Sequence, residues 1–230
     1  MRLSYLSYPD TLQDCVTDEE RYVLKHPIGK EFIDLAQRSL NVFKMLRKGI
    51  LPVLHCFLLL RVYRKYAPEE GDMVDGSDSE TFTGFLVKIS TSIGLNTDVS
   101  RSAWVKDESM YVDQWRKCWY SVYFFDFMEN CNMGNSSSID IDSFDTKLPE
   151  FKLNPVNGSY PSFITDAPLE DVVVNNFQKN FESSLIARDL LNCITNKRLK
   201  FSIPSLQIIL NNLNGSIEKN FGSCLNDIIN

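Results

Sequence analysis

Histidine is scarce in this sequence, which has only His26 and His55 among its 230 residues. Catalytic zinc is usually held by several histidine or acidic side chains, and a hydrolytic triad needs a histidine beside its nucleophile. Neither histidine lies near a Gly-x-Ser-x-Gly elbow. The scarcity argues against zinc-dependent and triad-type hydrolysis, and we expect no enzyme activity.

Paired cysteines are also lacking. The sequence has six cysteines but no C-x-x-C pair, which argues against a zinc ribbon and a thioredoxin-type redox site. Their spacings are wide and irregular, and several fall within apolar helical patterns. We therefore expect reduced core thiols of an intracellular protein. The six are Cys15, Cys56, Cys118, Cys131, Cys193 and Cys224.

Long hydrophobic runs and excess positive charge are missing as well. The longest apolar run, ILPVLHCFLLL (50–60), is about half the length that spans a bilayer. The first ten residues, MRLSYLSYPD, contain no apolar core of a signal peptide. The net charge of −6 disfavours binding to nucleic acid or to an anionic membrane surface.

What the sequence does have is helical periodicity and, with 43% hydrophobic residues, enough apolar material for a core. No alternation typical of strands occurs, so the pattern predicts an all-α, multi-helix bundle. Because 51–66 is apolar on most sides, we expect it to be central. Gly94 is expected to end its helix in a left-handed conformation. Apolar residues recur every three or four positions in 29–49, 51–66, 80–96, 108–134, 167–199 and 203–230.

Two segments read as loops. Residues 67–80 are acidic and rich in glycine and serine, which predicts a solvated loop. Residues 135–162 contain several prolines and are expected to be extended. The second loop carries Asp140, Asp142 and Asp145, which resemble half of a calcium loop but lack its central glycine and its closing glutamate.

Asp126 closes the aromatic stretch QWRKCWYSVYFFD (114–126). On a helical wheel it falls on one face with the apolar residues Trp115, Trp119, Val122 and Tyr123, so it should point into the core. A buried carboxylate must be paired, hydrogen-bonded or neutral. The basic candidates are Arg61, Arg64 and Arg116, and we favour Arg61 or Arg64 because they follow the apolar run 50–60. No second carboxylate cluster accompanies Asp126, which argues against a magnesium-dependent prenyl-diphosphate site.

The segment 115–149 resembles the signature of the fungal-specific transcription factor domain, the regulatory middle region of Zn2Cys6 zinc-cluster transcription factors. Arg116 and Lys117 match the basic pair of the signature, and residues 118–120 match its Leu-Trp-Trp. The sequence departs from the pattern at 135–136, where Asn-Ser replaces Arg-Pro, and at Tyr120, where the family has a second tryptophan. Further matches are Ser121, Tyr123, Asp126, Gly134, the Ile-Asp run 139–142 and Leu148–Pro149.

Residues upstream of this segment add to the resemblance. The run 50–63 is similar to the family's helix before the loop, and 82–98 is similar to its helix end, where glycine and leucine precede an aspartate. The FDTKLP ending (144–149) is similar to that of yeast regulators that respond to oleate or heme. The resemblance implies a core over 29–150, an N-terminal helical extension at 1–28 and a helical continuation at 151–230.

By this resemblance the chain would be the effector-sensing, repressing or dimerising domain of a nuclear regulator of RNA polymerase II transcription. Partners would be a small apolar effector, a second copy of the chain or co-regulator proteins. DNA binding and zinc would belong to a six-cysteine module that the sequence lacks, so the chain would be a fragment or a truncated member and needs no cofactor. The residues implied as structural are Arg116, Trp119, Tyr123, Asp126, Gly134 and Pro149, and the candidate effector pocket is Trp119, Tyr123 and Phe127. The alternative is a helical scaffold or dimerising inhibitor of the same fold.

Overall fold

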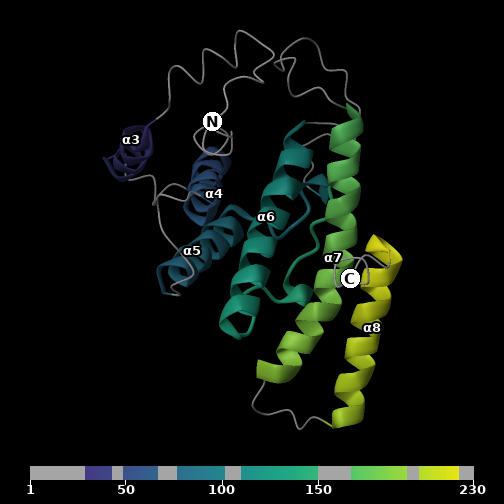
Figure 1. The fold of residues 1–230 in the computed structure, drawn as a ribbon. Helices are drawn as coiled ribbons and strands as arrows, with labels where there is room; N and C mark the ends of the chain where they lie inside the picture. The colour runs from purple at the N-terminus through teal and green to yellow at the C-terminus, as the bar shows by residue number, and fades with distance from the viewer. Residues whose placement is uncertain are drawn as a thin grey trace, which may run out of the picture. The chain divides into compact units, whose positions relative to one another are not determined.

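The structure is a computed structural model that describes residues 29–42, 49–66, 77–101, 110–149, 167–195 and 202–222 (Figure 1). These residues form six α-helices, labelled α3 to α8, and two single-turn 3₁₀ helices, with no strand among them. The predicted all-α class is confirmed. The chain divides into two compact units, Met1–Gly94 and Leu95–Asn230. The N-terminal extension expected at 1–28 lies outside the described residues.

The first unit contains α3 (Lys30–Val42), α4 (Leu51–Tyr66) and α5 (Ser77–Ile93). Helices α4 and α5 pack together through aromatic rings, because Phe57 of α4 lies with its ring centroid 6.1 Å from Phe82 and 5.0 Å from Phe85. Leu54 and Leu86 are fully buried. Such apolar side chains each contribute about 1.5–3 kcal/mol when they leave water, which makes this helix pair the core of the unit.

One expectation about the first unit needs correction, whereas the central position expected for α4 stays a prediction. Helix α4 buries residues along most of its length, although Leu59 is 70% exposed and Cys56 is also exposed. Helix α5 begins at Ser77, inside the segment expected to be a loop. The Ser-Asp-Ser-Glu sequence at 77–80 is typical of a first helical turn, where small polar and acidic residues stabilise the free N–H groups.

The second unit contains α6 (Met110–Met133), α7 (Ala167–Thr195) and α8 (Ile203–Phe221), with η4 at Val99–Arg101 and η5 at Ile141–Ser143. Helix α7 packs against both α6 and α8 (Figure 1). Aromatic rings packed edge to face join α6 to α7. The ring centroid of Phe181 lies 5.0 Å from that of Tyr120 and 5.2 Å from that of Tyr123. No residue of α8 is buried, so α6 and α7 supply the core of this unit.

Two glycines end helices in left-handed conformations, with φ of 91° at Gly94 after α5 and 66° at Gly134 after α6. The expectation for Gly94 is therefore confirmed, and its N–H donates to the Thr91 carbonyl at 3.0 Å. Glycine is favoured at such positions because a Cβ atom would crowd the backbone. Each glycine turns the chain sharply, and the segments that follow them, 95–101 and 135–149, build the site described below.

Candidate functional site

Helix α6 presents one buried face, and the signature residues Trp119, Tyr123 and Asp126 lie on it. Trp119, Val122 and Tyr123 are fully buried, and Asp126 is only 1% exposed. The helical wheel drawn from the sequence placed these four side chains on one face, and their burial confirms that arrangement. Trp115, at the outer end of the same face, is half-buried and donates its Nε1–H to the Thr97 carbonyl at 3.2 Å.

A first polar centre forms around Asp98, which is 2% exposed. Arg116 of α6 binds it at two points, with Nε 2.9 Å from Oδ2 and Nη2 3.0 Å from Oδ1. The Ser100 backbone N–H and hydroxyl also donate to Oδ1, and the Lys147 N–H donates to Oδ2 at 2.8 Å. Five hydrogen bonds therefore converge on one carboxylate, and they join α6 to two loops.

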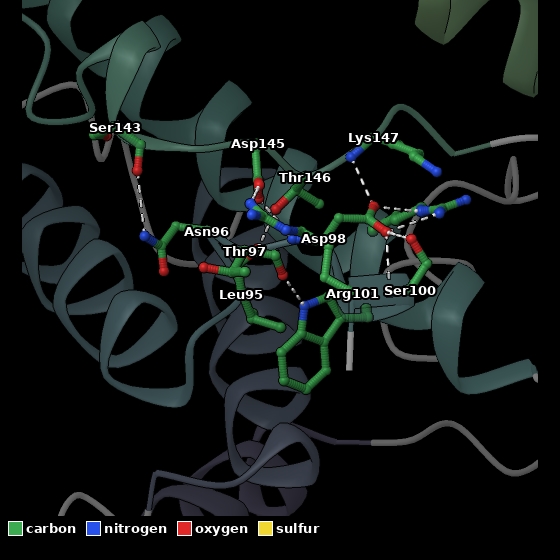
Figure 2. Close-up of polar contacts among 12 residues, drawn as sticks. Leu95, Asn96, Thr97, Asp98, Ser100, Arg101, Ser143, Asp145, Thr146 and Lys147 are labelled. Atoms are coloured by element: carbon green, nitrogen blue, oxygen red, sulfur yellow. Dashed lines mark hydrogen bonds and ion pairs between the residues drawn. The ribbon is translucent and has the colours of Figure 1, made fainter. Parts of the chain in front are cut away.

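The same two loops are tied to each other directly (Figure 2). The Asp98 N–H donates to Asp145 Oδ1 at 2.9 Å, and the Asp145 N–H donates to the Asn96 carbonyl at 3.0 Å. Arg101 forms an ion pair with the other oxygen of Asp145. Thr146 donates its hydroxyl to the Leu95 carbonyl. We call the set formed by 95–101, Arg116 and 143–147 the Asp98 clasp.

Hydrogen bonding controls the charge at the centre of the clasp. Burial alone would raise the pKa of Asp98, but the donors on Arg116, Ser100 and the Lys147 N–H outweigh burial and hold its pKa well below the usual value. The pKa of Asp145 is lowered as well, chiefly by the Asp98 N–H and further by Arg101. Both carboxylates are therefore ionised at neutral pH, which keeps the two-point pair with Arg116 intact.

A second polar centre forms around Asp126 at the far end of α6. Its carboxylate accepts hydrogen bonds from the Ser137 hydroxyl, from the Ser138 and Ile139 N–H groups at 3.1 Å, and from Asn130 Nδ2 at 3.0 Å. The loop after Gly134 therefore folds back over the helix end. Asp126 is buried and hydrogen-bonded, as the helical wheel indicated. Arg61 and Arg64 belong to the first unit, and their expected pairing with Asp126 stays a prediction.

An arginine reaches this second centre from α7. Arg188 is 4% exposed and donates from Nη2 to the Ser137 hydroxyl oxygen at 2.6 Å. Its guanidinium carbon lies 5.2 Å above the centre of the Tyr123 ring. A cation held against an aromatic face is stabilised by the ring's negative potential. Arg188 and Asp126 thus face each other through the Ser137 hydroxyl, and we call these three residues the Ser137 bridge.

The three residues expected to form an effector pocket are all buried on α6. Trp119 packs against Phe144 at 5.3 Å between ring centroids, and Tyr123 lies 6.1 Å from the same ring. Phe127 is 8% exposed. Within the described part of the chain, the buried Nε1–H of Trp119 has no hydrogen-bond acceptor. A buried donor without an acceptor costs about 1–3 kcal/mol, so an acceptor brought by a bound molecule would be stabilised there.

The remaining signature residues have structural contacts. Gly134 provides the turn after α6. Pro149 is buried, and its carbonyl accepts a hydrogen bond from Gln178 of α7 at 3.1 Å. Tyr120, which stands where the family has tryptophan, donates its hydroxyl to the Thr146 carbonyl at 2.7 Å. The departure from the family pattern therefore adds a hydrogen bond to the Asp98 clasp.

Within the ranges that the structure describes, the site has neither a metal-binding cluster nor a reactive buried thiol. Among the described residues, no group of three or more histidine, cysteine, aspartate or glutamate side chains could hold a metal ion. Asp140, one of the three aspartates that resemble half of a calcium loop, accepts the Asp142 N–H at the start of η5. Burial raises the pKa of the Cys118 thiol to about 12, so it is protonated and unreactive at neutral pH. None of the described helices is long and apolar enough to cross a bilayer.

Several site residues carried signals that the sequence reasoning did not use. Arg116 falls near the apolar face of α6 on the wheel, and a basic residue there needs an acidic partner. Asp98 stands out in the sequence only as the end of a pattern that resembles the family's. Ser137 and Arg188 carried no comparable signal, because serine and arginine are common in loops and on helix surfaces.

Comparison with known proteins places this arrangement in a family. Residues 4–213 match the family described as "Fungal specific transcription factor domain", and the chain belongs to that family. The fold described above is therefore that of a fungal-specific transcription factor domain. No solved structure matches the chain significantly.

Two characterised fungal proteins are similar to the chain. Multidrug resistance regulator 1 of Candida albicans is 32% identical over 148 residues, which cover 63% of this chain and 13% of that protein. Oleate-activated transcription factor 1 of Saccharomyces cerevisiae is 30% identical over 105 residues, which cover 44% of this chain and 10% of that protein. The aligned region is therefore a small part of both regulators.

Proposed function

We propose that the chain is the regulatory region of a nuclear, zinc-cluster type transcription regulator and that it acts by binding an effector or a co-regulator. Its membership in the family supports this role. Contact with DNA would be made by residues other than these, because the sequence has a net charge of −6 and no C-x-x-C pair. Its output would be the control of RNA polymerase II transcription.

The main support for the proposal is that two signature residues are buried and hold loops in place. Arg116 and Asp126 each anchor a loop onto α6 through buried hydrogen bonds. Neither is exposed in a way that suits contact with a phosphate backbone or a substrate. The signature thus specifies a packed module, whose changes in packing can be passed to the rest of a regulator.

A small apolar effector would bind at Trp119, Tyr123 and Phe127. Support comes from the apolar surroundings of these side chains and from the Trp119 indole N–H, which has no acceptor within the described residues. An effector with one acceptor atom and an apolar body would satisfy that donor while replacing ring contacts. Binding of this kind favours one packing of α6 over another, which is the requirement for allosteric control.

A reporter assay tests the regulatory role. The chain would be inserted between a heterologous DNA-binding domain and a heterologous activation domain, and reporter transcription measured in yeast. We expect the insert to lower output several-fold, and Arg116→Met, which breaks the clasp, to restore it. Lys117→Met is the matched control, since Lys117 forms an ion pair with Asp113 at a partly exposed position on the same helix. Equal output with and without the insert would contradict the proposal.

Effector binding is tested separately by titration calorimetry against a panel of apolar compounds that carry one acceptor group. Trp119→Phe removes the indole N–H and keeps an aromatic ring. We expect it to weaken binding about tenfold, which corresponds to a single hydrogen bond of about 1.4 kcal/mol. Unchanged affinity in Trp119→Phe would place the effector elsewhere.

A dimerising scaffold is the second candidate, and α8 favours it. This helix has no buried residue, and Ile203, Ile208 and Leu210 are exposed. Its two charged residues, Glu218 and Lys219, carry opposite charges that sum to zero. Two copies of the helix could therefore meet without net charge repulsion. Light scattering would show a dimer that Leu210→Glu reduces to a monomer, and a monomeric wild-type chain would remove this candidate.

A further inference from the structure

The Ser137 hydroxyl lies between two buried groups of opposite charge. It donates to Asp126 Oδ2 and accepts from Arg188 Nη2 at 2.6 Å. Asp126 is 1% and Arg188 4% exposed. Ser137 itself is only half-buried, and its neighbours Ser136 and Ser138 are exposed. A single hydroxyl on an accessible loop therefore connects α6 to α7.

Arg188 has hydrogen-bonding capacity that the bridge does not use. Its Nη1 is buried and has no acceptor among the described residues, although Nη2 of the same guanidinium is bonded to Ser137. The stacking on Tyr123 holds the guanidinium in place. Arginine binds phosphate through two parallel N–H groups, and here one such group donates to the hydroxyl while the other is free to donate to an anion's oxygen.

The sequence after Ser137 has a charge pattern of the kind that protein kinases recognise in their substrates. Residues 137–140 read Ser-Ser-Ile-Asp, which places an acidic residue three positions after Ser137. Protein kinases select substrates partly by such charge patterns. The other serines of the loop, Ser136, Ser138 and Ser143, are followed three positions later by Ile139, Ile141 and Thr146. Only Ser137 in this loop carries the acidic signal.

We infer that Ser137 is a phosphorylation site for an acid-directed serine kinase, with Arg188 as the group that receives the phosphate. In the reaction the Ser137 oxygen forms a bond to the γ-phosphorus of ATP. The bond from that phosphorus to the oxygen bridging to the β-phosphorus breaks, ADP leaves, and the hydroxyl proton passes to the kinase's base. The inference does not depend on the effector proposed above.

Phosphorylation would open the second polar centre. The modified serine has no O–H to donate to Asp126, and its phosphate brings about −1.5 to −2 charges next to that carboxylate. The resulting repulsion disfavours the hydrogen bonds from the Ser138 and Ile139 N–H groups to Asp126. Arg188 can follow the phosphate through Nη1 and Nη2. The loop would then leave α6 and remain attached to α7.

The purified 230-residue chain would be incubated with ATP and a serine kinase that requires an acidic residue at the third position after its target. Mass spectrometry of digests would locate the phosphate. We expect phosphorylation at Ser137, slowed at least tenfold by Asp140→Asn and unchanged by the matched variant Asp142→Asn. No phosphate on Ser137, or phosphate that persists on the loop in Ser137→Ala, would overturn the inference.

Hydrogen exchange then tests the consequence without any substitution that could prevent folding. We expect the Ser138 and Ile139 amides to exchange at least tenfold faster in the phosphorylated chain than in the unmodified one. The Lys147 amide, which donates to Asp98, serves as the internal control and should keep its protection. Equal exchange at all three amides before and after phosphorylation would show that the bridge is not a switch.

Discussion

Arg116 and Asp98 lie 18 residues apart in the sequence and form a two-point ion pair, with N–O distances of 2.9 and 3.0 Å. Their side chains are 6% and 2% exposed. A buried pair of this kind does not guarantee high stability, because both charges had to leave water. It does make each partner costly to remove alone, since the other charge would remain buried without compensation.

The first prediction concerns this pair. Arg116→Met should lower the free energy of unfolding by about 3–5 kcal/mol, because it leaves the Asp98 carboxylate without its cation. The measurement is urea unfolding followed by circular dichroism. The double variant Asp98→Leu, Arg116→Met should lose much less than the sum of the two single variants, because neither charge is then left alone.

Lys117→Met is the control for the first prediction. Lys117 forms an ion pair with Asp113 at 2.6 Å, but both side chains are at least one-third exposed. A surface pair one helical turn apart contributes about 0.3–0.5 kcal/mol. A loss of stability in Lys117→Met as large as that in Arg116→Met would show that burial of the Asp98 clasp has no special role.

The second prediction concerns pH. Because the pKa of Asp98 is lowered in the folded chain, the unfolded chain binds its proton at a higher pH. The stability that Asp98 contributes is therefore complete above about pH 4, the usual aspartate value, and is lost as the pH falls toward its folded pKa. Unfolding measured from neutral to acidic pH should show this loss, and Asp98→Asn should reduce it. Carboxyl NMR that gave Asp98 an ordinary pKa would contradict the prediction.

The third prediction concerns Asp126. Asp126→Asn replaces one carboxylate oxygen by an NH2 group that cannot accept. Either the hydrogen bond from Asn130 Nδ2 to Oδ1 is lost, or those from the Ser137 hydroxyl and the Ile139 N–H to Oδ2 are lost. Stability should fall by about 1–3 kcal/mol. Asp142→Asn makes the same chemical change at an exposed site and should stay within about 0.5 kcal/mol. Equal stability of the two variants would show that the loop does not depend on Asp126.

The fourth prediction compares two glycines. Gly134 has φ of 66°, and a Cβ atom there would meet nothing within 4 Å, so Gly134→Ala tests the backbone conformation alone. It should cost about 1–2 kcal/mol. Gly84 lies inside α5 with equally open space, and Gly84→Ala should stabilise the chain by about 0.5–1 kcal/mol. Thermal unfolding of both variants checks the opposite signs.

The fifth prediction concerns thiol reactivity. The pKa of Cys118 is raised to about 12 by burial, whereas Cys56 is exposed. A thiol reagent at about pH 8 should therefore label Cys56 quickly and Cys118 only when the chain unfolds. Labelling followed by mass spectrometry gives both rates. Rapid labelling of Cys118 under native conditions would show that the buried face of α6 opens readily.

The sequence predicted the parts of this structure that depend on local patterns. Hydrophobic spacing identified α4, α5 and α6, and Gly94 was correctly assigned to a helix end. The burial of Asp126 followed from its position on the wheel. The donors to Asp126 were not predicted, because two of them are backbone N–H groups, which every residue except proline carries. No pattern of side chains marks where a loop will place its backbone.

The Asp98 clasp could not be predicted from the sequence, for a similar reason. The hydrogen bond from the Lys147 N–H to Asp98 spans 49 positions, and only the folded chain brings the two loops together. Local spacing carries no information over that distance. The resemblance to the family did point to both segments, at 82–98 and 144–149, but it could not show that they meet at one carboxylate.

The hydrogen bond from the Lys147 N–H to Asp98 sets a minimum length for any shortened version of the second unit that keeps the clasp. A fragment that stops before Lys147 removes a donor to Asp98, and one that starts after Leu95 removes the acceptor of Thr146. Either cut leaves a buried polar group without its partner, even though α6 itself is complete. A shortened piece that keeps the Asp98 clasp must therefore include Leu95 to Lys147, and deletion series should lose stability as soon as either boundary is crossed.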